Sequence, residues 1–396
     1  MTGQKFIYVD NAATTKTLDI VASSMLEIMT HNFGNPSSIY KLGANAKQII
    51  DNARTDIASL FSAKPNEIYF TSGGSESDNW AIKGAAKAMA LKGKKHIITS
   101  KIEHHAVLHT LDSLKKDGFD VTYLDVYEDG IIKIEDLKNA IRPDTALVSI
   151  MYANNEIGTI QPVKEIGAVC KEHNILFHTD AVQAVGHIKI NVDDDNIDLM
   201  SASAHKLHGP KGVGLLYMRN SAKIKNLIDG GAQERGKRAG TENVAGIAGF
   251  SIALKIAYDE IEQKNKKVRS MRDRLINSIL KIDRSILNGH PTQRLPGNIN
   301  VCFKGIEGES LLLNLDLIGV SASSGSACTS GSLDPSHVLL ALGLKHEVAH
   351  GSLRISLDEY NTDEEIDYII NNLPGIVAKL RAMSPLWEKI IKEDEI

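Results

Sequence analysis

A lysine near the middle of the chain has neighbours that are unusual for a surface lysine. Lys206 lies in SASAHKLHGPKGVG (residues 201–214), where small residues, histidines and glycines surround it. A lysine amine held partly away from water has a lowered pKa, which frees its lone pair to form a Schiff base with an aldehyde. Lys206 is therefore a candidate nucleophile, and an ordinary turn lysine is the competing interpretation.

Two further segments could hold a cofactor that binds such an amine. Asp180 follows the apolar run ILFHT (175–179), and a carboxylate there can pair with the protonated ring nitrogen of pyridoxal phosphate. In YFTSGGSESDNWAIKG (69–84), two glycines follow a strand, and Ser75 opens a helix whose free N–H groups suit a phosphate. Each feature alone also fits a plain turn or helix cap. Together they favour a pyridoxal phosphate enzyme, because all three would lie at strand ends of one sheet.

One of the three cysteines has a setting unlike the others. Cys328 lies in SASSGSACTSGSLDPSH (321–337), which is nearly all Ser, Gly and Ala and offers no apolar neighbours to pack against. The thiol is either accessible for chemistry or incidental to an ordinary flexible loop. Cys170 falls on the apolar stripe of a helical pattern and Cys302 alternates within NINVCF, so core packing is expected for both.

The composition argues against several classes of protein. The 45 basic and 49 acidic side chains leave a net charge of −4 without a long basic block, so no nucleic-acid partner is expected. Because no run of 18 apolar residues and no signal-peptide pattern occurs, neither a membrane span nor export is expected. The odd, widely spaced cysteines fit neither a disulfide framework nor a zinc site, which favours the reducing cytoplasm. Dinucleotide and Walker patterns are also missing.

Strand-like and helix-like segments alternate through the first part of the chain. This alternation predicts an α/β fold with a mostly parallel central sheet covered by helices on both faces, and catalytic groups at the carboxyl ends of its strands. A helical segment is expected at 162–173, opened by Pro162. The strand candidates are residues 67–71, 96–100, 121–125, 146–151, 175–180, 197–203 and 213–218.

The C-terminal part has a different pattern, and the chain is long enough for two domains. A long helical stretch over about 242–285 precedes strands at 298–303 and 353–358 and a short helix at 308–319. A last helix should begin at the capping box of Thr362 and Glu365 and kink at Pro374. We therefore expect a large cofactor-binding α/β domain over 14–263. A small α+β domain would comprise 1–13 and 264–396 and carry the cysteine loop (about 321–335).

Motifs along nearly the whole chain resemble those of one enzyme family. They are VDNAATT (9–15), FGNPSS (33–38), TSGGSESDN (71–79), EHHAVL (103–108), YANNEIGTIQP (152–162), HTDAVQAVG (178–186), SASAHKLHGPKGVG (201–214), RAGTEN (238–243), SSGSACTSGS (323–332), HGSLRISL (350–357) and SPLW (384–387). In these motifs the chain resembles the NifS/IscS-type cysteine desulfurases, within the class V aminotransferase group of fold-type I pyridoxal phosphate enzymes.

The resemblance implies a role for each matching residue in holding the cofactor. Lys206 would bind it covalently, His104 would stack on its pyridine ring, and Asp180 would pair with the ring nitrogen. Gln183 would bond its phenolate oxygen, and Asn155 would also contact it. The phosphate would be held by Gly74, Ser75, Ser203 and His205, with Thr241 reaching in from a second subunit. The family often has Ala-Thr where this chain has Gly74-Ser75, and the hydroxyl of Ser75 keeps the phosphate contact.

The resemblance also implies the reaction. Asn155 and Arg354 would bind the carboxylate of L-cysteine, since a guanidinium fork suits that planar anion. Lys206 would remove the Cα proton, and Cys328 would attack the substrate sulfur, leaving alanine and a Cys328 persulfide. His104, a helix-start histidine by default, would take up the thiol proton.

The implied partners follow from that reaction. They are L-cysteine, a second copy of the chain in a homodimer, and a sulfur-acceptor protein such as an iron–sulfur scaffold. No permanent metal ligand is implied, although the Cys328 persulfide could contact an iron–sulfur cluster during transfer.

Three alternatives stay open on the sequence alone. An aminotransferase of similar fold would need no protein thiol, so it would tolerate Cys328→Ser. A selenocysteine lyase would strongly prefer the selenium substrate. A non-catalytic scaffold of the sulfur pathway would not need Lys206, Asp180, His104 and Cys328 together.

Overall fold

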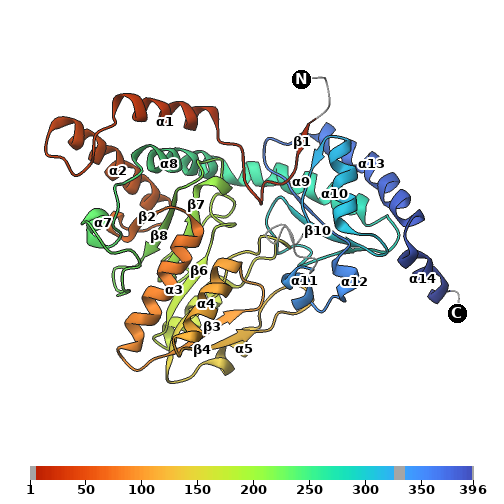
Figure 1. Ribbon diagram of the computed structural model, residues 1–396, viewed down its shortest axis with the longest axis horizontal. Helices are drawn as coiled ribbons and strands as arrows, with labels where there is room; N and C mark the ends of the chain where they lie inside the picture. The colour runs from red at the N-terminus through yellow and green to blue at the C-terminus, as the bar shows by residue number, and fades with distance from the viewer. Residues whose placement is uncertain (1–5, 325–334, 395–396) are drawn as a thin grey trace.

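The computed structural model describes residues 6–324 and 335–394 (Figure 1). Cys328 lies outside the described residues, as do all but the two ends of the expected cysteine loop. Of the cysteines in the described part, Cys170 and Cys302 are buried, which confirms their expected place in the core. No helix among the described residues is both long and apolar enough to span a membrane.

The central sheet has seven strands in the order β2-β8-β7-β6-β5-β3-β4. Each predicted strand segment overlaps one of them, with ends that differ by at most two residues. β8 runs antiparallel to both β2 and β7, and the other neighbouring pairs are parallel. The expectation of a mostly parallel sheet is therefore confirmed. The strands are β2 (Ile68–Thr71), β3 (His96–Ser100), β4 (Asp120–Leu124), β5 (Thr145–Ser149), β6 (Leu176–Asp180), β7 (Leu199–Ser203) and β8 (Gly214–Met218).

Helices cover both faces of this sheet. Successive side chains of each strand point to opposite faces, so neighbouring residues of one strand pack against different helices. In β5, Leu147 packs in the core with α3 and α4, whereas Val148 packs in the core with α2, α6 and α8. The covering helices explain why the strands are apolar throughout, as parallel strands buried on two faces require. The helices of this part are α1 (Asp19–His31), α2 (Lys41–Leu60), α3 (Gly74–Ala90), α4 (His105–Lys116), α5 (Ile134–Ala140), α6 (Val163–Glu172), α7 (Gln233–Gly236) and α8 (Val244–Tyr258), with 3-10 turns η1 (Pro65–Glu67) and η2 (Ala204–Lys206).

A second core lies at the other side of the molecule (Figure 1). It gathers Ile7 and Val9 with apolar side chains of α9, β10, α10, β12 and α13. Its sheets are β12-β10-β9, antiparallel, and β1-β11, parallel. The remaining elements are β1 (Ile7–Tyr8), α9 (Ile261–Ile279), β9 (Ser285–Leu287), β10 (Asn298–Phe303), α10 (Gly308–Leu317), β11 (Val320–Ser321), α11 (His337–Ala341), α12 (His346–Ala349), β12 (Ser352–Ser356), α13 (Asp363–Ala382) and α14 (Pro385–Asp394).

We propose that these two cores mark the two expected domains, 14–263 and 1–13 with 264–396. The return of the N-terminal residues Ile7 and Val9 to the second core supports that division. Two short helices of the C-terminal half pack against the central sheet: Leu339 of α11 and Ala349 of α12 lie in the same core as Val148 of β5. These two short helices therefore join the proposed domains.

The predicted capping box of the last helix is confirmed, two other helical predictions need revision, and the kink at Pro374 stays a prediction. The expected long helix over 242–285 is two helices, α8 and α9, separated at Glu260, whose φ of 50° is left-handed. α13 begins at the predicted capping box, in which Thr362 accepts from the Glu365 N–H, and it continues through Pro374. Pro162 precedes α6 as its N-cap, so Val163 is the first helical residue.

Candidate active site

A cavity of about 300 Å³ lies at the carboxyl ends of β6 and β7, beside the start of α3. Its size is within the range of small-ligand sites. The predicted site residues that line it are Gly74, Ser75, His104, Asn155, Asp180, Gln183, Ser203, His205, Lys206 and Arg354. Residues from widely separated motifs thus meet in one place. Thr241 does not line this cavity, and Cys328 lies outside the described residues.

Lys206 is positioned by the N-terminal segment of the chain. The side-chain Nζ donates to the carbonyls of Ala12 (2.6 Å) and Ala13 (2.7 Å). The turn that carries Lys206 is tied to the same segment, because the backbone and hydroxyl of Thr15 both donate to the His205 carbonyl at 2.9 Å. These two backbone carbonyls hold the amine inside the cavity.

Asp180 ends β6 and is 6% exposed. One carboxylate oxygen accepts from the Val182 N–H at 3.0 Å. Burial raises the pKa of Asp180, while the nearby His104 and Lys206 oppose that rise. A buried carboxyl that faces a cavity in this way fits a ligand that brings a positive charge, such as the protonated ring nitrogen of pyridoxal phosphate.

Two more buried carboxyls lie near Asp180. Burial raises the pKa of Asp78, and the charge of Asp180 raises it further. Burial raises the pKa of Glu103 to about 8, although Ser100 and the Met151 N–H both donate to its carboxyl. Glu103 is therefore mostly protonated at neutral pH, and burial favours the neutral form of Asp78 as well.

His104 is the N-cap of α4, and its Nδ1 accepts from the Ala106 N–H at 3.1 Å. Burial lowers the pKa of His104, which keeps the ring neutral at neutral pH. Because Nδ1 is an acceptor, the proton of the neutral ring is on Nε2. Uptake of a thiol proton would require the Nδ1 bond to Ala106 to break, so that role stays a prediction.

The start of α3 has the features expected of a phosphate cradle. The helix begins at Gly74, where the first N–H groups have no partners within the helix. A Cβ on Gly74 would lie 2.7 Å from Cγ2 of Val182, so a larger residue here would require Val182 to shift. His205 faces the same cavity, and burial lowers its pKa to about 4. A helix start with neutral donors around it fits the phosphate of the cofactor.

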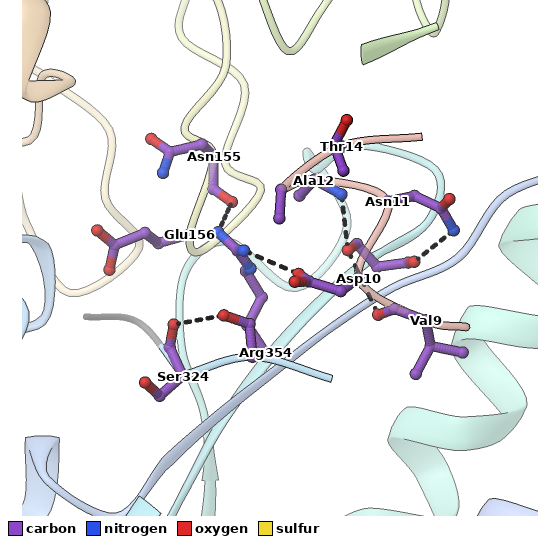
Figure 2. A network of polar contacts seen from close by, with 12 residues as sticks. Val9, Asp10, Asn11, Ala12, Thr14, Asn155, Glu156, Ser324 and Arg354 are labelled. Atoms are coloured by element: carbon purple, nitrogen blue, oxygen red, sulfur yellow. Dashed lines mark hydrogen bonds and ion pairs between the residues drawn. The ribbon is translucent and has the colours of Figure 1, made fainter. Parts of the chain in front are cut away.

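Arg354 of β12 lies buried beside Asn155 (Figure 2). Its Nη1 donates to the Asn155 carbonyl at 3.2 Å, and its Nη2 donates to Asp10 at 2.9 Å. Nε has no hydrogen-bond partner among the described residues. A guanidinium held in this way has donors left for a carboxylate. The role of Asn155 and Arg354 in binding substrate remains a prediction.

The residue-level reasoning missed part of this site. Asp10, Ala12 and Ala13 contact Arg354 and Lys206, and Asp78 lines the cavity. All four lie in two quoted motifs, VDNAATT and TSGGSESDN, so the motifs gave a signal that the single residues did not.

The cysteines in the described part are unsuited to accept sulfur. Burial raises the pKa of the Cys302 thiol to about 11, and it raises that of Cys170 still more. A thiol held protonated in a core is a poor nucleophile. Cys328 is thus the remaining candidate among the three cysteines of the sequence.

Comparison with known proteins agrees with this site. The model of the aminotransferase class-V family matches residues 7–369. The chain belongs to the class-V aminotransferase family. Among its curated relatives in that family, a Methanosarcina thermophila protein named cysteine desulfurase IscS is 58% identical, over 98% of this chain and 96% of its own.

Two further proteins are similar to this chain over nearly its whole length. A Clostridium botulinum protein, also named cysteine desulfurase IscS, is 57% identical over 99% of both chains. A solved structure of a NifS-like protein superposes with a TM-score of 0.90 and 39% identity, covering 95% of this chain and all of the other. These class-V proteins have the fold-type I architecture, and the prediction of family and fold is confirmed.

Proposed function

We infer that this chain is a pyridoxal-phosphate-dependent cysteine desulfurase, which converts L-cysteine to L-alanine and passes the sulfur on. The observation that carries this inference is one cavity that brings together the amine of Lys206, the carboxyl of Asp180 and the guanidinium of Arg354. An amine, an anion for a ring nitrogen and a cation for a carboxylate are what a cofactor-bound amino acid needs.

The cofactor would be held by the residues around the cavity. When bound, pyridoxal phosphate supplies an aldehyde for the substrate amine and a ring that takes up electrons released at Cα. Asp180 would keep a proton on the ring nitrogen, and the start of α3 with Ser75, Ser203 and His205 would hold the phosphate. His104 and Gln183 fix the ring in place, the latter through a side chain that also donates to the Ala12 carbonyl at 2.9 Å.

The substrate would be oriented by Arg354 and Asn155, which we propose bind its carboxylate. Lys206, once its Nζ is free of the cofactor, removes the Cα proton. The carbonyls of Ala12 and Ala13 are placed to steady the protonated amine afterwards. In the overall change, the carbon–sulfur bond of cysteine breaks and a sulfur–sulfur bond forms on the enzyme.

We propose Cys328 as the sulfur acceptor. Its thiolate attacks the substrate sulfur, so cysteine and one enzyme thiol become alanine and one enzyme persulfide, with no external oxidant or reductant. The burial of Cys170 and Cys302 supports this assignment. The thiol must stay reduced, and we therefore place the reaction in the cytoplasm. The sulfur then passes to an acceptor protein, for which we propose an iron–sulfur scaffold.

We also propose that the chain works as a homodimer. Six large apolar side chains within residues 20–40 are exposed: Ile20, Leu26, Met29, Phe33, Ile39 and Tyr40. Exposed apolar surface of this kind is typical of a protein interface. Thr241 is exposed and away from the cavity of its own chain, which is consistent with its expected place in a partner's phosphate site.

The test of the function is mass spectrometry after L-cysteine is added to the cofactor-loaded protein. We expect one additional sulfur on Cys328 and an equal amount of alanine. Cys328→Ser should abolish the persulfide, and Lys206→Ala should abolish both products. Cys302→Ser serves as the matched cysteine control and should leave persulfide formation intact. Alanine formation that persists without an added sulfur, or a 3-mercaptopyruvate product from transamination of L-cysteine, would overturn the proposal.

A further inference from the structure

The guanidinium of Arg354 is held by partners from two separate segments (Figure 2). Arg354 is 2% exposed, so its charge is almost wholly removed from water. Nη1 is bonded to the backbone of Asn155, a neutral acceptor, and Nη2 is bonded to the carboxylate of Asp10. Of these two partners only Asp10 offsets the charge, and the carboxylate is 18% exposed. A charge-assisted bond of this kind is stronger than a neutral one.

Asp10 is itself fixed by its neighbours in sequence. The Ser356 N–H donates to the Val9 carbonyl at 2.7 Å, which ties the residue before Asp10 to β12. On the other side, the Asn11 side chain donates to the Ser356 carbonyl at 3.0 Å and the Ala12 N–H donates to the Ser356 hydroxyl at 2.8 Å. Because Ser356 is two residues from Arg354 on the same strand, the Asp10 carboxylate and the guanidinium are held in one rigid frame.

A second carboxyl near Arg354 is bonded elsewhere. Glu156 is close enough for Arg354 to influence its charge, but its side chain accepts from the Ser336 hydroxyl. Burial raises the pKa of Glu156 to about 7, so a large fraction of this group is neutral near pH 7. Asp10 is therefore the carboxylate that sets the direction of the guanidinium.

We propose that Asp10 is a positioning residue, which holds Arg354 so that its remaining donors receive the carboxylate of the amino-acid substrate. This inference rests on the proposed function and adds a residue to it. Asp10 fixes the rotamer of a long side chain before the substrate arrives, and the entropy of ordering that side chain is then not lost on binding. The same segment holds Lys206 through Ala12 and Ala13, so one stretch of chain positions both cations of the site.

The test compares two ligands that differ only by a carboxylate: L-alanine and ethylamine. Binding is measured by titrating each into the cofactor-loaded protein and following the cofactor absorbance. In Asp10→Ala, we expect the Kd of L-alanine to rise about tenfold or more, the scale of one lost charge-assisted hydrogen bond. The Kd of ethylamine should stay within about twofold, because it has no carboxylate for Arg354 to bind.

Two further variants separate positioning from stability. Asp10→Asn keeps the size and an oxygen acceptor, so it should fold and weaken L-alanine binding by a smaller factor, about threefold. Asp19→Asn is the matched control on the same segment, since the Asp19 side chain is 95% exposed, and it should bind both ligands normally. In an Arg354→Ala background, Asp10→Ala should change L-alanine binding no further.

The outcomes are distinct. If Asp10 only stabilised the fold, its variants would lower the melting temperature and weaken L-alanine and ethylamine alike, and the proposal would be wrong. Unchanged L-alanine binding in Asp10→Ala and Asp10→Asn would also overturn it. Failure of the wild-type protein to form a persulfide from L-cysteine would refute the proposed function, whereas the two-ligand comparison still reports on Asp10.

Discussion

At the scale of the residue, burial decides which groups of this site carry charge. Burial raises the pKa of Asp78, Glu103 and Asp180, which have the same chemistry and lie close together, and for Asp180 the nearby His104 and Lys206 oppose that rise. For the other two, burial is opposed by hydrogen bonds from uncharged donors. Because adjacent charges in a low dielectric repel one another, the neutral form of Glu103 at pH 7 reduces the repulsion that an ionised Asp180 would meet.

Glu103 allows a direct test of this view. Its pKa is near 4.5 in the unfolded chain and about 8 in the folded one. Between these values the folded chain holds a proton that the unfolded chain has released, so the free energy of unfolding falls as pH rises from about 4.5 to about 8. In Glu103→Gln this loss disappears. Between these pH limits, the free energy of unfolding of the variant should rise relative to that of the wild type by on the order of 4 kcal/mol.

The measurement is urea unfolding at several pH values, with fixed protein and cofactor concentrations. Glu135→Gln is the control, because the Glu135 side chain is 69% exposed. Equal pH dependence for Glu103→Gln and wild type would mean that Glu103 is charged in the folded protein, against the electrostatics described above.

At the scale of the element, a buried ion pair anchors the segment that leads to Thr241. Arg54 of α2 and Glu234 of α7 form two bonds of 2.7 and 2.8 Å, and Glu234 also accepts from the Phe70 N–H. The side chains are only 9% and 2% exposed. Glu234 and Arg235 both have left-handed φ values, 47° and 59°, which the surrounding bonds must hold in place.

Glu234→Gln should therefore destabilise the protein strongly. It leaves the Arg54 guanidinium buried without a counter-charge, which costs about 3–5 kcal/mol in the free energy of unfolding. Replacing both partners, with Arg54→Met and Glu234→Leu, should cost less than Glu234→Gln alone. Asp56→Asn breaks an exposed pair with Lys255 and should cost less than about 1 kcal/mol. Urea unfolding of the three variants measures these differences, and a similar small effect for all would contradict the argument.

The elements themselves were largely predictable from sequence, because apolar runs and helical spacing report local packing directly. The seven strands, the helix after Pro162 and the capping box at Thr362 all follow from such patterns. The break between α8 and α9 did not, since Glu260 adopts its left-handed conformation without a glycine or proline to indicate it. Local pattern does not encode a turn that tertiary packing imposes.

The residues of the site were only partly predictable from the sequence. Lys206, Asp180 and the Gly74 cradle could be proposed from the residues that surround them. Arg354, Asn155 and Gln183 came only from the resemblance to a family. Asp10 lies in the family motif VDNAATT but was given no role, because its partner Arg354 is 344 residues away and the contact exists only once β12 and the N-terminal segment are side by side. Long-range ion pairs of this kind are visible in a structure alone.

At the scale of the whole molecule, the two groups that we expect to serve one dimer lie on the same side. α1, α2 and α7 lie at one end of the molecule, and α13 and α14 lie at the opposite end (Figure 1). The exposed apolar residues of 20–40 and the segment that carries Thr241 thus belong to one region. An ion pair between Arg238 and Glu76, at 2.8 Å, also connects the segment that carries Thr241 to the first turn of α3. An interface there would place each Thr241 near a phosphate cradle.

A mixed dimer tests whether Thr241 works in the partner's site. Thr241→Ala should weaken phosphate binding, and Lys206→Ala should abolish catalysis. In a dimer of one Lys206→Ala chain and one Thr241→Ala chain, carrying different tags, action across the interface leaves one site with both native residues. We expect about half the wild-type rate of alanine formation under conditions where each parent dimer is deficient. Action within one chain leaves both sites defective, so a mixed dimer no more active than its Thr241→Ala parent would exclude the shared site.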